Sequence, residues 1–176
     1  MILRQRLFTI CTALFTGLFL MHGASAEPAK ANFIYVGPAD HHALLGAKQG
    51  TEEANLQGKF LNQSYNLDVI SPDAVAEHDF SGYLAVVTAV DKETFVHLTE
   101  KLSGIPVFNL VLEDEALRTA CINNALHTIP SQRMRADAER QWHKKKPDSK
   151  AKAQGWHPDF VEFAARDLNK RFEKSF

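Results

Sequence analysis

The feature that most constrains this fold is an unbroken apolar run from Tyr83 to Val90, made mainly of valine, alanine and leucine. A strand with one solvated face alternates apolar and polar side chains, and this run does not alternate. The strand is therefore predicted to be buried on both faces. Both sides of the sheet that contains it must then be covered by other elements.

Four further segments have strand character, at residues 33–37, 65–70, 105–112 and 125–129. Apolar side chains at helical spacing predict helices within 40–58 and 95–104, and two more are expected at 113–121 and 132–146, the last capped by Ser131. Strands that alternate with helices of this length imply right-handed βαβ crossovers. We predict an α/β lobe with a doubly wound, mainly parallel sheet and helices on both faces.

The N-terminal residues 1–26 are predicted to be a cleavable secretory signal peptide. Arg4 and Arg6 supply the positive region, residues 7–20 supply the apolar region, and a small-x-small cleavage sequence ends at Ala26. The apolar region is too short to span a bilayer comfortably, and nothing after it resembles a stop-transfer segment. We expect a soluble extracytoplasmic domain without a membrane anchor after cleavage.

Charge and cysteine content narrow the function classes. The chain has 20 Lys and Arg residues against 21 Asp and Glu residues, and loss of Arg4 and Arg6 with the signal leaves a net charge of −3. This balance excludes the basic surface typical of a nucleic-acid-binding protein.

Cys121 is the only cysteine of the mature chain, so no intramolecular disulfide forms. We expect it to be a small buried side chain.

Two segments follow the predicted lobe at 27–146. Residues 147–155 contain no large apolar side chain and are predicted to be a solvated linker. Residues 156–176 are predicted to be an amphipathic helix that begins near Pro158 and carries an apolar stripe of Phe160, Phe163, Ala164, Leu168 and Phe172. The stripe and Trp156 are expected to pack on the lobe. A docking surface for a partner, including a second copy in a homodimer, is the alternative.

Ligands of doubly wound sheets meet the loops at the carboxyl ends of the strands. In this chain those loops are 38–42, 88–92 and the turn after Leu112. Their polar residues, together with one in the fourth strand, are the candidate ligand-binding residues: Asp40, His41, His42, Thr88, Asp91 and Asn109. Asp91 also suits a helix N-cap, which is the favoured interpretation. Asn109 is either a solute contact or a hydrogen-bonded core amide.

No motif of a metal site or of an enzyme stands out. A metal needs three or four converging ligands, to which His78, Asp79, His127 or His157 could contribute, but no His-x-x-x-His or Cys-x-x-Cys spacing occurs. Ordinary surface or capping histidines are therefore favoured, and no metal site is predicted. The chain also lacks Gly-x-Ser-x-Gly, a phosphate loop and a dinucleotide fingerprint. We predict that it is not an enzyme and uses no cofactor.

Several motifs resemble those of type 1 periplasmic solute-binding proteins, which serve ABC importers for branched-chain amino acids and related solutes. Ile34 to Pro38, followed by a helix that contains Gly46 to Asn55, resembles their N-terminal lobe. Asn124 to Ser131 and Asp167 to Phe172 are similar to a subgroup associated with PQQ-dependent (quinoprotein) alcohol dehydrogenase systems in methylotrophs and related bacteria.

The resemblance implies a periplasmic component of an ABC transporter, linked to a quinoprotein alcohol oxidation system. Its partners would be a small-molecule solute, an ABC permease and that dehydrogenase system. The resemblance covers 33–142 and 156–173 and omits the second lobe with which such proteins close on their ligand. The alternative is a single-lobe accessory or interaction protein that no longer binds a transported solute. A periplasmic metal carrier that uses the histidines is a third hypothesis.

Overall fold

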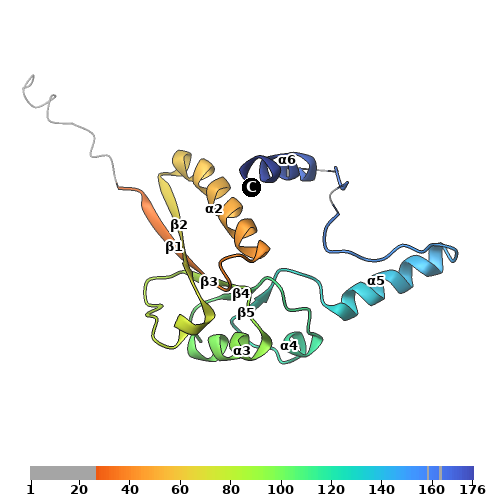
Figure 1. Cartoon of the computed structure of the whole chain (residues 1–176), viewed down its shortest axis with the longest axis horizontal. Helices are drawn as coiled ribbons and strands as arrows, with labels where there is room; N and C mark the ends of the chain where they lie inside the picture. The colour runs from red at the N-terminus through yellow and green to blue at the C-terminus, as the bar shows by residue number, and fades with distance from the viewer. Residues whose placement is uncertain (1–26, 158, 163) are drawn as a thin grey trace, which may run out of the picture.

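The structure is a computed structural model that describes residues 27–157, 159–162 and 164–176 (Figure 1). The predicted signal peptide at 1–26, Pro158 and Phe163 lie outside the described residues. None of the described helices combines the length and the apolar character needed to cross a membrane.

Within the described residues, the strands form one parallel sheet in the order β2-β1-β3-β4-β5. This is one of the common doubly wound orders, in which the direction of winding reverses between β1 and β3. The predicted α/β class is therefore confirmed. The strands are β1 (Ala29–Val36), β2 (Gln63–Ile70), β3 (Ala85–Thr88), β4 (Val107–Asn109) and β5 (Ala125–His127).

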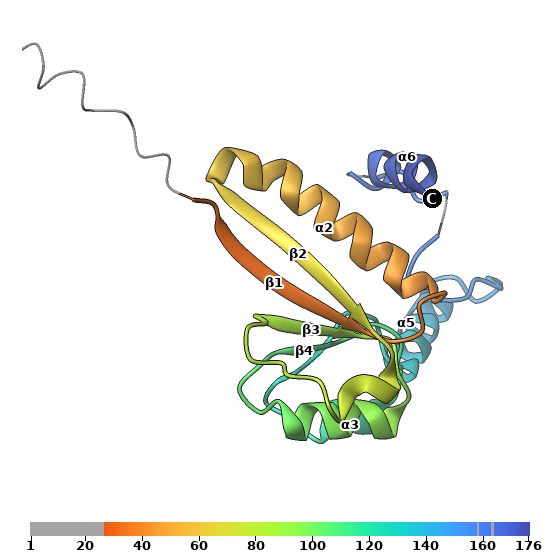
Figure 2. The ribbon, with the colours of Figure 1, turned by 60° about the vertical axis from the view of Figure 1, so that its left-hand side comes forward.

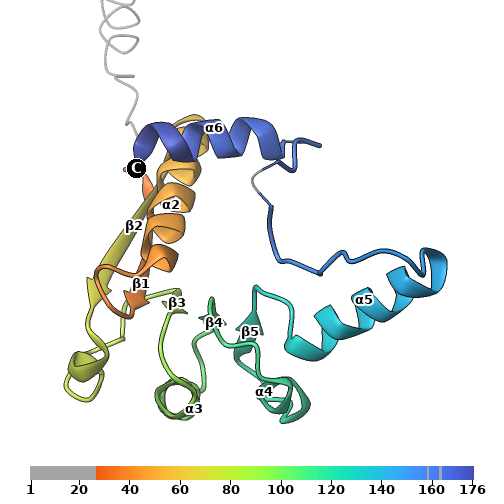
Figure 3. The same ribbon diagram turned by 45° about the vertical axis from the view of Figure 1, so that its right-hand side comes forward.

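Helices lie on both sides of this sheet, as Figures 2 and 3 show. The helices α2 and α6 lie on one side, and α3 and α4 lie on the other. The helix α5 extends away from the lobe, and the chain then returns to place α6 near α2. The helical elements are α2 (His42–Leu61), the 3-10 helix η1 (Pro72–Val75), α3 (Lys92–Lys101), α4 (Glu115–Thr119), α5 (Gln132–Lys145) and α6 (Ala165–Ser175).

Strand lengths differ from those predicted. The apolar run from Tyr83 to Val90 contributes only Ala85–Thr88 to the ladder, although Ala89 and Val90 are buried too. A run of apolar residues indicates which residues are buried. The length of the strand depends instead on how many residues form hydrogen bonds with the neighbouring strand. Conversely, β1 begins at Ala29, before the predicted start, because it pairs with β2 over its whole length.

The C-terminal helix begins at Ala165, not near Pro158 as predicted. Trp156 and Phe160 precede it in irregular backbone, where both are exposed and their rings meet edge to face at 6.0 Å. His157 Nδ1 accepts a hydrogen bond from the backbone N–H of Asp159 at 3.1 Å. The predicted stripe is therefore divided between irregular backbone and α6.

The sheet is packed unequally on its two faces. On the α3 side, a large cluster of buried apolar residues includes Ile34, Val86, Phe95, Leu98 and Val107. On the α2 side, the fully buried cluster is small and consists of Tyr35, Leu44 and Ala89. The core therefore lies mainly between the sheet and α3.

Part of the α2 face remains open. The strand register places Tyr35, Val87, Phe108 and Leu126 in one row across β1, β3, β4 and β5. Tyr35 is fully buried beside α2, Val87 and Phe108 are half-buried, and Leu126 is 44 % exposed. The exposure of Leu126 leaves the β5 end of this row accessible to solvent.

Cys121 is exposed, which contradicts the expected buried side chain. It lies in the turn after α4 with φ +49°. This left-handed backbone region favours glycine and disfavours a residue with a Cβ. The turn geometry, which depends on how α4 meets β5, therefore decides the position of this side chain.

Candidate functional site

The predicted ligand loops meet where the winding of the sheet reverses. The carboxyl end of β1 leads into residues 38–42, and the carboxyl end of neighbouring β3 leads into residues 89–92. Ligands of doubly wound folds bind in the crevice at this point. The tertiary structure thus brings two of the predicted loops together.

The side chain of Tyr35 lies where these loops meet. The side chain is fully buried, and its hydroxyl donates to the carbonyl oxygen of Pro38 at 3.4 Å. A Cβ at Gly37 would lie 2.6 Å from the Tyr35 hydroxyl and 3.0 Å from the Ala89 carbonyl oxygen, so only glycine fits. Burial, aided by the charge of Asp40, raises the pKa of Tyr35 and keeps its phenol neutral.

Two polar side chains of these loops cap helices. His41 Nδ1 accepts from the backbone N–H of Ala43 at 3.0 Å and caps α2. Asp91 accepts from the backbone N–H of Thr94 at 2.9 Å and from its hydroxyl at 2.8 Å, which caps α3 and lowers the pKa of Asp91. The predicted N-cap at Asp91 is therefore confirmed. Asp40 and His42 lie exposed beside these caps.

Asn109 is a hydrogen-bonded core amide. It is fully buried, and its Oδ1 accepts from the backbone N–H groups of Val111 at 3.0 Å and Leu112 at 2.7 Å. Its Nδ2 donates to the Leu112 carbonyl oxygen at 2.7 Å and lies 2.9 Å from His127 Nδ1. The neighbouring Thr88 is 1 % exposed and donates to the Phe108 carbonyl oxygen at 3.1 Å. Neither side chain is turned toward a ligand.

His127, which is half-buried at the end of β5, completes this network. Burial first, and the charge of Arg118 second, lower the pKa of His127. The neutral ring can accept the hydrogen bond from Asn109 at Nδ1, with its own proton on Nε2. The ring thus acts as a hydrogen-bond acceptor for Asn109.

The third predicted loop, after Leu112, anchors α5. Ser131 is fully buried, caps α5 by accepting from the Met134 N–H at 3.1 Å, and donates to the Glu115 carboxylate at 2.5 Å. Arg135, in the first turn of α5, forms an ion pair with Glu113. The direction in which α5 leaves the lobe is therefore fixed by bonds at its base.

Within the described part of the chain, no group of three or more His, Cys, Asp or Glu side chains is placed to hold a metal ion. The four additional candidates are used elsewhere. His78 packs edge to face on Phe80 with ring centroids 4.9 Å apart, and Asp79 binds Ser81. His127 is bonded to Asn109, and His157 forms the local turn described above.

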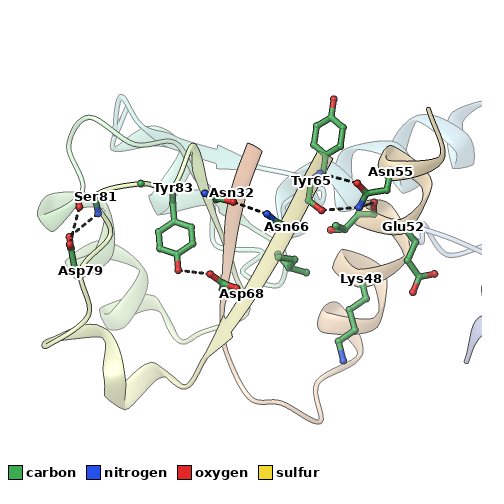
Figure 4. A pocket seen from close by; sticks show the side chains of 13 residues that line it. Asn32, Lys48, Glu52, Asn55, Tyr65, Asn66, Asp68, Asp79, Ser81 and Tyr83 are labelled. Atoms are coloured by element: carbon green, nitrogen blue, oxygen red, sulfur yellow. Dashed lines mark hydrogen bonds between the residues drawn. The ribbon is translucent and has the colours of Figure 1, made fainter. Parts of the chain in front are cut away.

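The sequence did not indicate a polar hollow of about 730 Å³ along the edge strand β2 (Figure 4). Its side chains bond to one another. Tyr83 donates to Asp68 at 2.6 Å, which raises the pKa of Tyr83 to about 12, and Asn66 donates to Asn32 at 3.0 Å. The alternation of polar and apolar residues along β2 is the only sequence feature that could have indicated it.

Asn55 of α2 protects this edge of the sheet. Its side-chain amide donates to the Tyr65 carbonyl oxygen at 2.8 Å and accepts from the Tyr65 N–H at 2.9 Å. An outward-facing backbone pair on an edge strand is thereby satisfied within the chain. These bonds support a structural role for this part of the hollow.

Comparison with known proteins identified no relative: no protein-family model, curated protein or solved structure matches the chain.

Proposed function

We propose that this protein is a single-lobe accessory protein of the periplasm, which acts through contacts with other proteins and neither catalyses a reaction nor encloses a transported solute. The observation that carries the proposal is the open apolar row of Val87, Phe108 and Leu126 on the α2 face. The polar groups at the switch point support it, because His41, Asp91 and Asn109 are already bonded to backbone.

The helix that follows β5 does not return to cover this row. Ser131 and the Arg135–Glu113 ion pair direct α5 away from the lobe. None of the residues of α5 is buried, and its large apolar side chains are exposed: Met134 by 56 % and Trp142 by 41 %. An exposed apolar face and an exposed apolar helix in one chain both favour association.

Charge favours a second copy as the occupant. Residues 27–131 contain six Lys and Arg against fourteen Asp and Glu, a net charge of −8. Residues 132–176 contain twelve against seven, a net charge of +5. The basic α5 of one copy thus complements the acidic lobe of another. In a dimer with two-fold symmetry, this contact would form twice.

Light scattering after size exclusion, over a range of protein and salt concentrations, tests this arrangement. We expect a dimer that dissociates as salt is raised. Leu126→Asp should give a monomer, whereas Leu84→Asp, at a leucine 59 % exposed outside the row, should remain dimeric. A wild-type protein that stays monomeric at every concentration would contradict the second copy as occupant.

The resemblance to the subgroup linked to quinoprotein alcohol oxidation supports that system as the place of action. The test is direct binding, by biolayer interferometry, to the purified PQQ-dependent alcohol dehydrogenase of the same cell. Binding that survives Leu84→Asp supports the proposal, and no binding at micromolar concentrations removes the dehydrogenase from it.

Solute binding of the ABC-importer kind is the second candidate, favoured by the meeting of two predicted loops at the switch point. Calorimetry with branched-chain amino acids distinguishes it. We expect weak or absent binding, because one lobe cannot enclose the ligand and the buried Tyr35 side chain lies where the two loops meet. Submicromolar affinity of a monomer would favour this second candidate.

A further inference from the structure

A cavity of about 470 Å³ separates α2 from the C-terminal segment. One wall is the face of α2 that carries Gly46 and Gly50, and the other is formed by Trp156, Leu168 and Phe172. Leu168 and Phe172 lie one turn apart on α6 and are half-buried against this space. The cavity lies on the opposite side of α2 from the polar hollow of Figure 4, and neither the switch point nor the open sheet face contributes to it.

Two glycines form part of the α2 wall of this cavity. Gly46 and Gly50 lie four residues apart, so they are neighbours on one face of α2. A Cβ added at either position would meet no atom within 4 Å. Glycine in the interior of a helix destabilises it relative to alanine, and neither position has a steric reason for it. The absence of side chains on this face of α2 instead leaves space for a ligand.

Gln49, which lines the same cavity, has a buried polar atom without a partner. Gln49 is only 6 % exposed, and its Nε2 donates to Glu53 Oε1 at 2.8 Å. Its Oε1 is buried and accepts no hydrogen bond. The amide cannot be reversed, because its oxygen would then face the carboxylate of Glu53. A buried acceptor without a donor is costly, so a ligand that supplies a donor would be favoured.

The charged group of the cavity is already neutralised. Glu53 accepts from Arg171 of α6, whose Nε lies 2.7 Å from Oε1 and whose Nη2 lies 3.2 Å from Oε2. These bonds from Arg171 and Gln49 lower the pKa of Glu53, which is consistent with an ionised carboxylate. A charged ligand of either sign would have to compete with this ion pair, which does not favour a ligand of either charge.

From this combination we infer that the cavity binds a small uncharged molecule with an apolar body and one hydrogen-bond donor, such as an aliphatic alcohol. The hydroxyl donates to Gln49 Oε1, and the apolar body lies between the glycine face of α2 and the side chains of Leu168, Phe172 and Trp156. The cavity volume lies within the range of small-molecule sites. Occupancy also holds α6 against α2.

Tryptophan fluorescence provides the test, because the chain contains two tryptophans. In a Trp142→Phe background, Trp156 is the only emitter, and cyclohexanol is a transparent, uncharged probe. We expect a saturable shift of Trp156 emission with cyclohexanol and none with cyclohexanecarboxylate. Gln49→Leu should weaken cyclohexanol binding on the order of tenfold, the factor expected for one hydrogen bond.

Filling the cavity supplies the control. Gly50→Leu should abolish the shift while circular dichroism shows an intact fold, and Gly104→Ala, where an added Cβ also meets nothing, should bind as the wild type does. If Gly50→Leu unfolds, Gly46→Leu takes its place. A wild type without a saturable shift, or an equal shift in a folded cavity-filled variant, would overturn the site. Leu126→Asp should bind cyclohexanol normally, so failure of the dimer and failure of the cavity are distinguishable.

Discussion

Replacement of Asn109 tests whether the most buried of the predicted ligand contacts is a structural amide. Asn109→Ala removes the acceptor of two backbone N–H groups, at Val111 and Leu112, and the donor to the Leu112 carbonyl oxygen. It also removes the contact of 2.9 Å with His127 Nδ1. Because the residue is fully buried, water cannot replace these bonds without entering the core.

The expected loss is large. Each hydrogen bond contributes about 0.5–1.5 kcal/mol net, and each buried group left without a partner costs about 1–3 kcal/mol. Partial relaxation of the loop makes a total of about 3–5 kcal/mol reasonable, out of an ordinary domain stability of about 5–15 kcal/mol. The melting temperature should fall by about 10–15 °C in a domain of this size.

Urea unfolding followed by circular dichroism measures the effect, with Asn66→Ala as the matched control. Asn66 donates one exposed hydrogen bond to Asn32, so its loss should change the free energy of unfolding by less than about 0.5 kcal/mol. A loss below about 1 kcal/mol for Asn109→Ala, at an unchanged m value, would refute the structural role and return Asn109 to the candidate ligand contacts.

Four further predictions follow from single residues. Gly37→Ala should cost about 1–3 kcal/mol in urea unfolding, because its Cβ would lie 2.6 Å from the Tyr35 hydroxyl, whereas Gly104→Ala should not destabilise. The pKa of Asp91 is lowered from 3.8 in the folded state, so its contribution to folding stability is present above pH 3.8 and is lost as pH falls through the folded pKa. Asp91→Asn keeps the helix cap and should remove this part of the acid sensitivity in urea unfolding. The pKa of His127 is lowered from 6.5, so the unfolded chain binds a proton more readily than the folded chain, and stability should fall as pH drops below 6.5. His127→Asn should flatten this dependence between pH 5 and 7, and an unchanged slope would contradict a neutral, half-buried imidazole. Bulky residues at Ala24 and Ala26 should block maturation, and a wild-type periplasmic protein that mass spectrometry finds still beginning at Met1 would contradict the signal peptide.

Much of the fold could be predicted because its signals are local. The non-alternating run around Val86 and the helical spacing in residues 40–58 depend only on neighbours a few positions away. Helix caps are equally local, so Asp91 and Ser131 were assigned correctly from sequence. The strand order could not be predicted, because it depends on which strands pair across long separations. The C-terminal helix was placed too early because the apolar spacing continues upstream of Ala165, where the backbone is irregular.

The candidate site, in contrast to the fold, depends mostly on contacts between residues that are distant in the sequence. The sequence could place Asn109 and His41 at the carboxyl ends of strands, but whether their polar atoms face a ligand or the backbone depends on the loops packed around them. In the same way, Gly46 and Gly50 indicate nothing in sequence, and only the position of α6 turns their bare face into a cavity. The sequence by itself determined the class of fold, because periodicity and caps are short-range. Only the tertiary structure decided which polar groups are already bonded and which apolar faces remain open, because both depend on partners far away along the chain.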